Sequence, residues 1–297
     1  GARLEHSLDV SITTPLFAAN GKYLAIAENK GKDLYLISDH DIAWQKTVDG
    51  DISSISVNEN GYVAIAISNT TYKTVIITFD TEGKQLFTMF MANTYAIDTS
   101  ISGDNKYLAI AEANFSGTLI QSNVKIVSIE KAQANKSEYI EYNYIANSND
   151  LIINIEYQDR NKLVCLYDSS VHVIQDNADT EVMKLDKNNV LFVDVNLKSN
   201  IARVIKTSDA ILNSNSELNF TNTTTNSVST YDLGGIPKSI QSYGDITVAN
   251  LGTEALFIKC NGWLCKKYNS GQEIKEIVLG QNIAGIVYKK KIEIIDL

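Results

Sequence analysis

The sequence predicts an all-β protein built from repeated four-stranded antiparallel sheets. Three observations indicate this fold class. A short phrase of residues recurs along the chain, apolar residues gather in runs of strand length between polar turns, and no segment of about ten or more residues combines a helical period with helix caps.

The recurring phrase is Asn-Gly-Lys-Tyr-Leu-Ala-Ile-Ala, which surrounds Tyr23 and returns in altered form around Tyr62 and Tyr107. The intervals between these tyrosines are 39 and 45 residues. A repeat of about 40–45 residues that holds four short strands is the signature of a β-propeller blade.

Each repeat follows the same order, which is clearest in the second one. An alternating strand at residues 52–57 leads through a polar turn into a nearly continuous apolar strand at 62–67. A continuous apolar run predicts a strand that is buried on both faces. A third strand at 74–80 and a fourth at 84–90 complete the unit, with Gly and Asn in the turns, where positive φ is needed.

The repeats divide nearly the whole chain into units. We place them at residues 12–47, 51–91, 95–144, 149–186, 189–233 and 236–279. The remainder, 281–297, supplies about two strands, and residues 3–10 can add the outer strand of that last unit, which would remove two sheet edges. We therefore expect one domain, 1–297: a seven-bladed β-propeller with four-stranded antiparallel blades, closed by N- and C-terminal strands that share the last blade. Six or eight blades stay open, because the later repeats are weak.

The charge balance excludes one class of partner. The chain has 26 Lys and Arg against 35 Asp and Glu, a net charge of −9, whereas nucleic-acid binding needs clustered cations. Apolar runs are far shorter than the roughly 18 residues of a membrane-spanning helix. The chain begins with Gly, so we expect any signal peptide or membrane anchor to lie outside this sequence.

The Asn-Gly-Lys-Tyr-Leu-Ala-Ile-Ala phrase resembles the turn-plus-strand repeat of WD40-like and quinoprotein-like propellers. Residues 80–87 look similar to the D-x-x-G-K-x-x-W phrase of quinone-dependent dehydrogenases, with Phe87 in place of tryptophan. Two tryptophans in all cannot build the tryptophan belt of those enzymes. The whole chain is similar to an uncharacterised family of membrane-anchored extracellular propeller domains from Gram-positive bacteria. That resemblance implies an extracellular location and a membrane tether, and it carries over no active-site residue.

Catalytic motifs are missing from the sequence. It contains no G-x-S-x-G, P-loop or H-E-x-x-H phrase, and its histidines, His6, His40 and His172, have no partner at a ligand spacing. The first hypothesis is therefore a monomeric, non-catalytic interaction module that binds a protein or a cell-wall glycan, without a cofactor.

The loops predict where that partner binds. Loops between second and third strands share a propeller face with the blade-to-blade connections, and two of them are long, 113–123 and 207–215. Apolar residues in otherwise polar loops, or tyrosines before a blade junction, indicate a contact surface, unless they cover blade edges. The candidate binding residues are Phe115, Leu119, Ile120, Tyr142 and Tyr144.

The alternative hypothesis is a lactonase-like hydrolase with Ca²⁺ in the central channel. Innermost strands line that channel, and hard oxygen ligands are what Ca²⁺ requires. One acid per blade would equally serve to solvate a narrow channel. The candidate ligands are Asp51, Asp98, Asp150 and Glu156.

The cysteines do not form a metal motif. Cys165 lies in an apolar run and is expected to be a buried small hydrophobe. Cys260 and Cys265 bracket Asn-Gly-Trp-Leu, which is neither a zinc nor a thioredoxin spacing. A two-residue turn would make them diagonal neighbours, too distant for an easy disulfide, whereas a four-residue loop would pair them directly.

Overall fold

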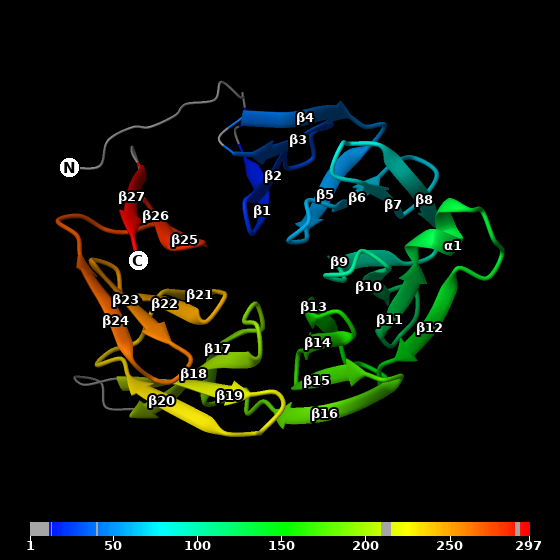
Figure 1. Ribbon diagram of the computed structural model, residues 1–297. Coiled ribbons are helices and arrows are strands. Elements are labelled where there is room, and N and C mark those ends of the chain that lie inside the picture. Colours follow the sequence, from blue (N-terminus) through cyan, green and yellow to red (C-terminus); the bar gives the residue numbers. More distant parts are fainter. Residues whose placement is uncertain (1–11, 13, 40, 209–214, 289–291) are drawn as a thin grey trace. The chain divides into compact units, whose positions relative to one another are not determined.

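The computed structural model describes residues 12, 14–39, 41–208, 215–288 and 292–297 (Figure 1). Within these residues the chain holds 27 strands and one five-residue helix, α1 (Ile129–Gln133). It separates into two compact units, Leu4–Glu181 and Val182–Leu297, which are described in turn.

The first unit is built from four sheets, and in each the strands pair antiparallel in chain order. The first sheet holds β1 (Pro15–Asn20), β2 (Tyr23–Glu28), β3 (Asp33–Ser38) and β4 (Asp41–Thr47), and the second holds β5 (Asp51–Val57), β6 (Val63–Ser68), β7 (Thr74–Phe79) and β8 (Gln85–Met91). The third holds β9 (Tyr95–Ile101), β10 (Tyr107–Asn114), β11 (Gln121–Ser128) and β12 (Ile140–Ile145), and the fourth holds β13 (Ile152–Asp159), β14 (Lys162–Tyr167), β15 (Ser170–Gln175) and β16 (Ala178–Lys184).

The second unit holds three more sheets. The fifth contains β17 (Val190–Asp194), β18 (Asn200–Ser208), β19 (Asn215–Asn222) and β20 (Val228–Asp232). The sixth contains β21 (Ser239–Tyr243), β22 (Ile246–Asn250), β23 (Glu254–Lys259) and β24 (Leu264–Asn269), and the seventh contains β25 (Glu276–Gly280), β26 (Ile283–Val287) and β27 (Ile292–Asp296). The segment expected to close the seventh sheet, residues 3–10, lies outside the described residues.

The structure moves one predicted boundary. Residues 276–279 were expected in the sixth repeat, but they form β25, which pairs with β26 in the seventh sheet. Asn282 has a φ of 60°, which gives this β25–β26 hairpin its tight turn. The predicted end of the sixth repeat was therefore wrong, because that signal for a hairpin was overlooked.

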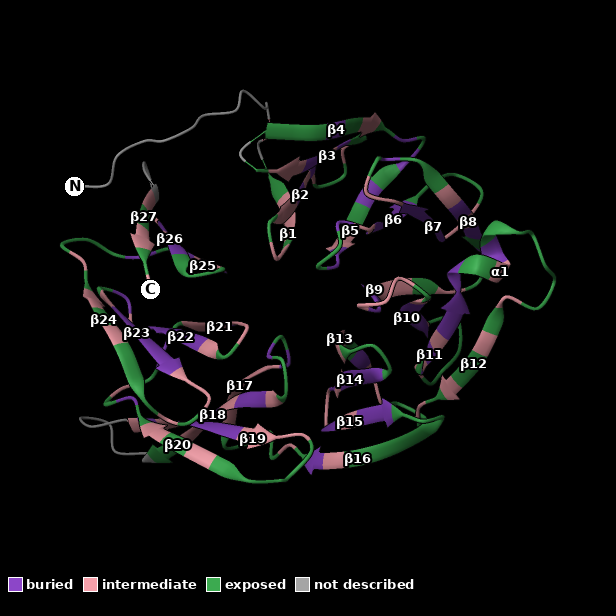
Figure 2. Ribbon diagram, in the orientation of Figure 1, coloured by how far each residue is buried: buried purple, intermediate pink, exposed green. Residues whose placement is uncertain are grey.

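The recurring phrase has a packing explanation. β6 and β10 are buried along most of their length (Figure 2). On β6, Ile65 packs into a core cluster shared with the first sheet, whereas Ala64 packs into the cluster shared with the third. On β10, Ile110 faces the second sheet and Ala109 the fourth. Large side chains thus face the preceding sheet and alanines the following one. Each fully buried Ile contributes about 1.5–3 kcal/mol.

The D-x-x-G-K phrase forms the β7–β8 turn and receives a side chain from the first sheet. The carboxylate of Asp80 accepts a hydrogen bond from the backbone N–H of Lys84 at 2.8 Å. Gly83 has a φ of +76°, and a Cβ there would lie 2.9 Å from the Trp44 ring. Trp44 Nε1 donates to the carbonyl of Thr81 at 3.0 Å. Glycine is therefore required for both backbone conformation and space.

Candidate functional site

Three connections of the first unit meet around one lysine. Lys73 ends the loop between β6 and β7, and its Nζ donates to the carbonyl of Asn93 in the β8–β9 connection at 3.2 Å. The same Nζ donates to Ser116 Oγ in the β10–β11 loop at 3.1 Å. Loops that are more than 40 residues apart in the sequence are thereby joined at one surface.

Two aromatic rings lie beside this lysine. Lys73 Nζ lies 5.0 Å from the ring centroid of Tyr95, and the Tyr95 and Phe115 centroids are 6.0 Å apart. We call Lys73, Tyr95 and Phe115 the loop patch. Its rings are open to solvent, with exposed fractions of 43% for Tyr95 and 45% for Phe115. Tyr72 and Phe90 form a separate ring pair at 4.8 Å, and Tyr72 packs against the core cluster shared by the first and second sheets.

A buried carboxylate fixes the backbone next to the loop patch. Glu112, on β10, is 2% exposed and forms an ion pair with Lys125 Nζ at 2.6 Å. Thr94 Oγ1 and Asn123 Nδ2 each donate to its oxygens at 2.9 Å. Glu112 therefore ties the β8–β9 connection to β11, and a fully hydrogen-bonded buried network of this kind rigidifies its surroundings.

The β10–β11 loop presents two of the sequence-predicted binding residues and turns the third inward. Phe115 and Leu119 are exposed, Leu119 by 48%. Ile120 is half-buried and is held by Asn149, whose Oδ1 accepts from Ile120 N at 3.2 Å and whose N–H donates to the Ile120 carbonyl at 3.0 Å. Leu119 extends the apolar surface of this loop, and Ile120 anchors it.

The two predicted tyrosines lie elsewhere, on the outermost strand of the third sheet. Tyr142 and Tyr144 occupy β12, with ring centroids 6.1 Å apart. The register sets Tyr144 opposite Val124 and Tyr142 opposite Ile126, progressively farther from the loop that ends before Gln121. The structure therefore brings Phe115 and Leu119 together and leaves this tyrosine pair apart from them.

Sequence reasoning missed the other two members of the loop patch, Lys73 and Tyr95. Tyr95 begins β9, so it is consistent with an ordinary strand residue. The available signal was that Tyr95 directly follows the blade-to-blade connection at residues 92–94.

Asp98, a candidate calcium ligand, has its carboxylate occupied by N–H donors. Its Oδ2 accepts from Asn154 Nδ2 at 2.6 Å and from Ile155 N at 2.9 Å, and its Oδ1 accepts from Thr99 N at 2.8 Å. Burial raises the pKa of Asp98 to about 6, because loss of solvent disfavours the charge more than these donors favour it. The carboxylate joins β9 of the third sheet to β13 of the fourth.

The other three candidate ligands do not gather around Asp98. Asp51 is exposed at the start of β5, and Asp150 lies in the turn before β13. Glu156, on β13, accepts from Ser100 Oγ at 3.4 Å. Among the described residues, no group of three or more His, Cys, Asp or Glu side chains is placed to hold a metal ion.

The second unit contains a buried acid in an arrangement like that of Asp98, in which the carboxylate accepts hydrogen bonds from the next sheet. Asp194 is the last residue of β17, and both the backbone N–H and the hydroxyl of Ser242, on β21, are hydrogen-bonded to it. Burial raises the pKa of Asp194 as well. An acid on the innermost strand thus serves in both units as an acceptor for donors of the next sheet.

His172 makes contacts in the order of a Ser-His-Asp triad. Its Nδ1 lies 2.8 Å from Asp179 Oδ1 and its Nε2 lies 3.1 Å from Ser170 Oγ. Ser170 is only 5% exposed, and the Tyr167 ring packs on the imidazole with centroids 4.3 Å apart. The His172–Asp179 contact connects β15 to β16, and the His172–Ser170 contact lies within β15. His6 and His40 lie outside the described residues.

All three cysteines are free thiols. Cys165 is buried, as expected from its apolar run. Cys260 lies in the β23–β24 turn, where Gly262 N donates to the Lys259 carbonyl at 2.8 Å. Cys265 is exposed on β24, and its Sγ donates to the carbonyl of Phe257 at 3.1 Å. The turn therefore matches neither geometry considered for a Cys260–Cys265 disulfide, and the two thiols remain separate.

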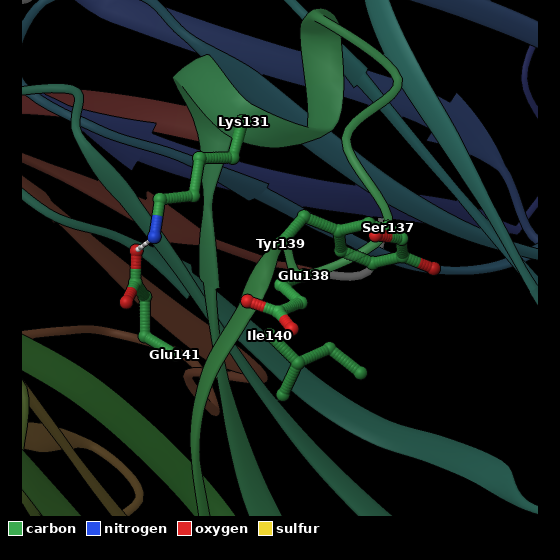
Figure 3. Close-up of a pocket in the computed structure, with 6 residues that line it drawn as sticks. All are labelled: Lys131, Ser137, Glu138, Tyr139, Ile140 and Glu141. Atoms are coloured by element: carbon green, nitrogen blue, oxygen red, sulfur yellow. Dashed lines mark ion pairs between the residues drawn. The ribbon is translucent and has the colours of Figure 1, made fainter.

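A shallow pocket of about 450 Å³ opens beside α1 (Figure 3). Its lining residues are Lys131, Ser137, Glu138, Tyr139, Ile140 and Glu141. Lys131 Nζ and Glu141 Oε1 form an ion pair across it at 2.8 Å.

Membrane-spanning helices are not found in the part of the chain that the structure describes, because its helix is too short to span the hydrocarbon layer.

Comparison with solved structures defines the class of protein. Hydrazine synthase of Kuenenia stuttgartiensis matches with a TM-score of 0.63 at 10% identity, over 100% of this chain and 99% of that one. The Pan2 WD40 domain of Neurospora crassa gives 0.58 at 9%, over 92% and 84% of the two chains, and BamB of Moraxella catarrhalis gives 0.51 at 8%, over 91% and 80%. With its seven sheets, the chain is a seven-bladed β-propeller.

Sequence comparison then assigns the family. Residues 6–297 match the model of a family of unknown function, DUF5711, and the chain belongs to that family. No curated protein matches the sequence. At identities of 8–10%, the likeness to solved structures shows the fold alone.

Proposed function

We propose that this propeller is a non-catalytic interaction module that binds a partner through the loop patch. The observation that supports it is the exposed Tyr95–Phe115 ring pair beside Lys73, which bridges the β8–β9 and β10–β11 connections. The fold commonly serves as a scaffold for protein interactions, and insertions in repeat proteins concentrate on the binding face.

The chemistry of the loop patch suits two kinds of partner, a protein and a cell-wall glycan. Exposed tyrosine and phenylalanine rings offer large apolar area at a small cost in conformational entropy. Lys73 adds a positive charge beside Tyr95, and Glu112 holds the supporting backbone before a partner arrives. A preorganised surface loses less entropy on binding than a mobile loop.

We also propose that the module works outside the cell, held to the membrane by a segment outside this sequence. The resemblance to extracellular propeller domains of Gram-positive bacteria supports this location. Protease treatment of intact cells that carry the epitope-tagged full-length protein tests it. The protease is expected to digest the tagged propeller on intact cells. Full protection of the propeller until the cells are lysed would contradict the proposal.

A double variant, Tyr95→Ala with Phe115→Ala, tests the binding role. Its binding is compared with wild type in two assays: co-sedimentation with purified cell walls, and chemical cross-linking to proteins on intact cells. Loss of both rings should weaken binding at least tenfold, because central aromatic residues each contribute about 1–2 kcal/mol or more. The matched control is Val228→Ala, which removes an equally exposed apolar side chain (53%) from β20.

The two assays also identify the class of partner. Loss of co-sedimentation assigns a glycan, and loss of a discrete cross-linked species assigns a protein. Unchanged binding of the double variant in both assays would refute the loop patch as the binding surface. For the calcium-dependent alternative, the described residues offer no group of three or more His, Cys, Asp or Glu side chains, and the Asp98 carboxylate accepts from three N–H donors.

A further inference from the structure

β12 forms an edge with unusually apolar exposed residues. It pairs with β11 on one side, and no described strand pairs with its other side (Figure 1). Ile140 is 39% exposed, Tyr142 40% and Ile145 74%. A strand edge leaves backbone N–H and C=O groups ready to pair with another extended chain.

Other outer strands of the first unit are protected in ways that β12 is not. β8 is covered by α1, because Phe87 and Met89 share a buried cluster with Ile129 and Ala132. β4 and β16 each carry a lysine, a residue that discourages edge-to-edge pairing. β12 has no lysine, and Glu141 is its sole charged residue.

The register of β12 shows which part is available. A β-bulge at Glu141 interrupts the pairing with β11 between Ile126 and Val127. From Tyr142 to Ile145 the ladder is regular. Bulges oppose further strand addition, so an incoming chain would pair along Tyr142–Ile145 and pass Glu141 without a regular ladder.

The pocket beside α1 lies at the start of this edge and supplies a charge. Lys131 is paired with Glu141, and the Glu138 carboxylate also interacts electrostatically with Lys131, without an ion-pair contact among the described residues (Figure 3). Two carboxylates thus share one cation, and this excess of negative charge favours a cationic side chain from the incoming chain. Successive residues of a strand point to opposite faces, so Tyr142 and Tyr144 lie on one face of β12 and Ile145 on the other. An incoming chain with apolar side chains at alternate positions places them beside one of these two apolar faces.

We propose that the β12 edge binds an extended peptide segment of a partner protein by strand addition. The segment carries apolar residues at alternate positions along Tyr142–Ile145 and a lysine or arginine at the end that reaches Glu138. Main-chain hydrogen bonds supply affinity in this mode of recognition, and the side-chain contacts supply specificity.

Fluorescence anisotropy with labelled peptides tests the proposal. The probe is a Thr-Val-Thr-Val-Thr-Val hexamer extended by Lys at either end, and matched peptides carry Glu in place of Lys or Pro in place of the central Val. Ile145→Lys places a gatekeeper on the edge, and Val228→Lys on β20 is its control. Glu138→Lys reverses the pocket charge, and Glu82→Lys, in the β7–β8 turn, is its control.

A lysine probe should bind wild type with a Kd below about 1 mM, and Ile145→Lys should weaken it at least tenfold. Glu138→Lys should weaken it about fivefold and make the glutamate peptide the better ligand, which a merely structural role of Glu138 would not produce. Both controls should bind like wild type.

Three outcomes would overturn the proposal. The first is no binding of either lysine probe up to about 1 mM. The second is equal binding of the proline peptide, which cannot complete the ladder. The third is self-association of wild type in sedimentation equilibrium that Ile145→Lys abolishes, because the occupant of the edge would then be a second copy of this chain.

Discussion

Replacing Asp98 by alanine tests whether one carboxylate holds the third sheet to the fourth. The substitution leaves Asn154 Nδ2 and the backbone N–H of Ile155 without their acceptor, and Ile155 is only 1% exposed. Each buried donor left unsatisfied costs about 1–3 kcal/mol. Relief of the buried charge offsets part of this cost, so we expect the free energy of unfolding to fall by about 2–4 kcal/mol at pH 7.

The pH dependence follows from the pKa of Asp98, which rises from 3.8 to about 6 on folding because of burial. The folded protein therefore takes up this proton first as the pH falls. The stability that protonation contributes is fully present below about pH 3.8 and is lost as the pH rises through about 6. Asp98→Asn cannot titrate. When the pH is lowered from 7.5 to 4.5, the free energy of unfolding of wild type should rise by about 1–3 kcal/mol relative to that of Asp98→Asn.

Urea denaturation followed by tyrosine and tryptophan fluorescence measures both effects. The control is Asp51→Ala, which removes an exposed acid that begins β5 and should change stability by less than about 0.5 kcal/mol. The reasoning fails if Asp98→Ala is as stable as Asp51→Ala. It fails equally if the difference between wild type and Asp98→Asn is the same at both pH values.

Three further predictions test the turns, the thiols and the metal site. Gly83→Ala should lower stability by about 1–3 kcal/mol, since it adds a Cβ at positive φ against Trp44, whereas Gly117→Ala, with no neighbour nearer than 3.6 Å, should be nearly neutral in the same denaturation assay. Cys265 should react with a thiol reagent in the native protein and Cys165 only after unfolding; mass spectrometry of labelled peptides that found Cys165 modified first would contradict the structure. Millimolar Ca²⁺ added after EDTA should leave the melting temperature unchanged within about 1 °C, and a rise of several degrees would support the calcium-site hypothesis instead.

The sequence was most informative where the same phrase recurs in successive repeats. The phrase around Tyr23, Tyr62 and Tyr107 predicted strands that are buried on both faces, and β2, β6 and β10 lie there. The alternation of large residues with alanine is a local pattern that records contacts with both neighbouring sheets, so the blades could be located without knowledge of those contacts. The last boundary was wrong because it fell at residues 280–281, in the turn between β25 and β26 that Asn282 helps to form, and no recurring phrase marks β25.

The candidate sites were harder to predict, because their partners come from other repeats. Asp98 looked like a free channel acid, yet its donors, Asn154 and Ile155, lie 56 and 57 residues away. Phe115 stood out in a polar loop, whereas Tyr95 did not, since it begins a strand. Their proximity depends on Lys73, a connection between repeats that spacing along one strand does not reveal.

Tyr142 and Tyr144 show a different limit. Their position near the end of the third repeat suggested the rim of a blade junction, but the strand order makes β12 the outer edge of its sheet. The helix α1 lengthens the connection before β12, and five residues are too few to leave a helical period in the sequence.

Site-specific photo-crosslinking tests the binding role of the loop patch most directly. A photoreactive phenylalanine analogue replaces Leu119, in the β10–β11 loop, or Glu82, in the β7–β8 turn at the opposite end of the second sheet. In cells that carry the full-length protein, an adduct should form from position 119 alone and disappear when Tyr95→Ala and Phe115→Ala are added. An equal adduct from position 82, or an adduct at 119 that survives loss of both rings, would show that this propeller binds its partner elsewhere.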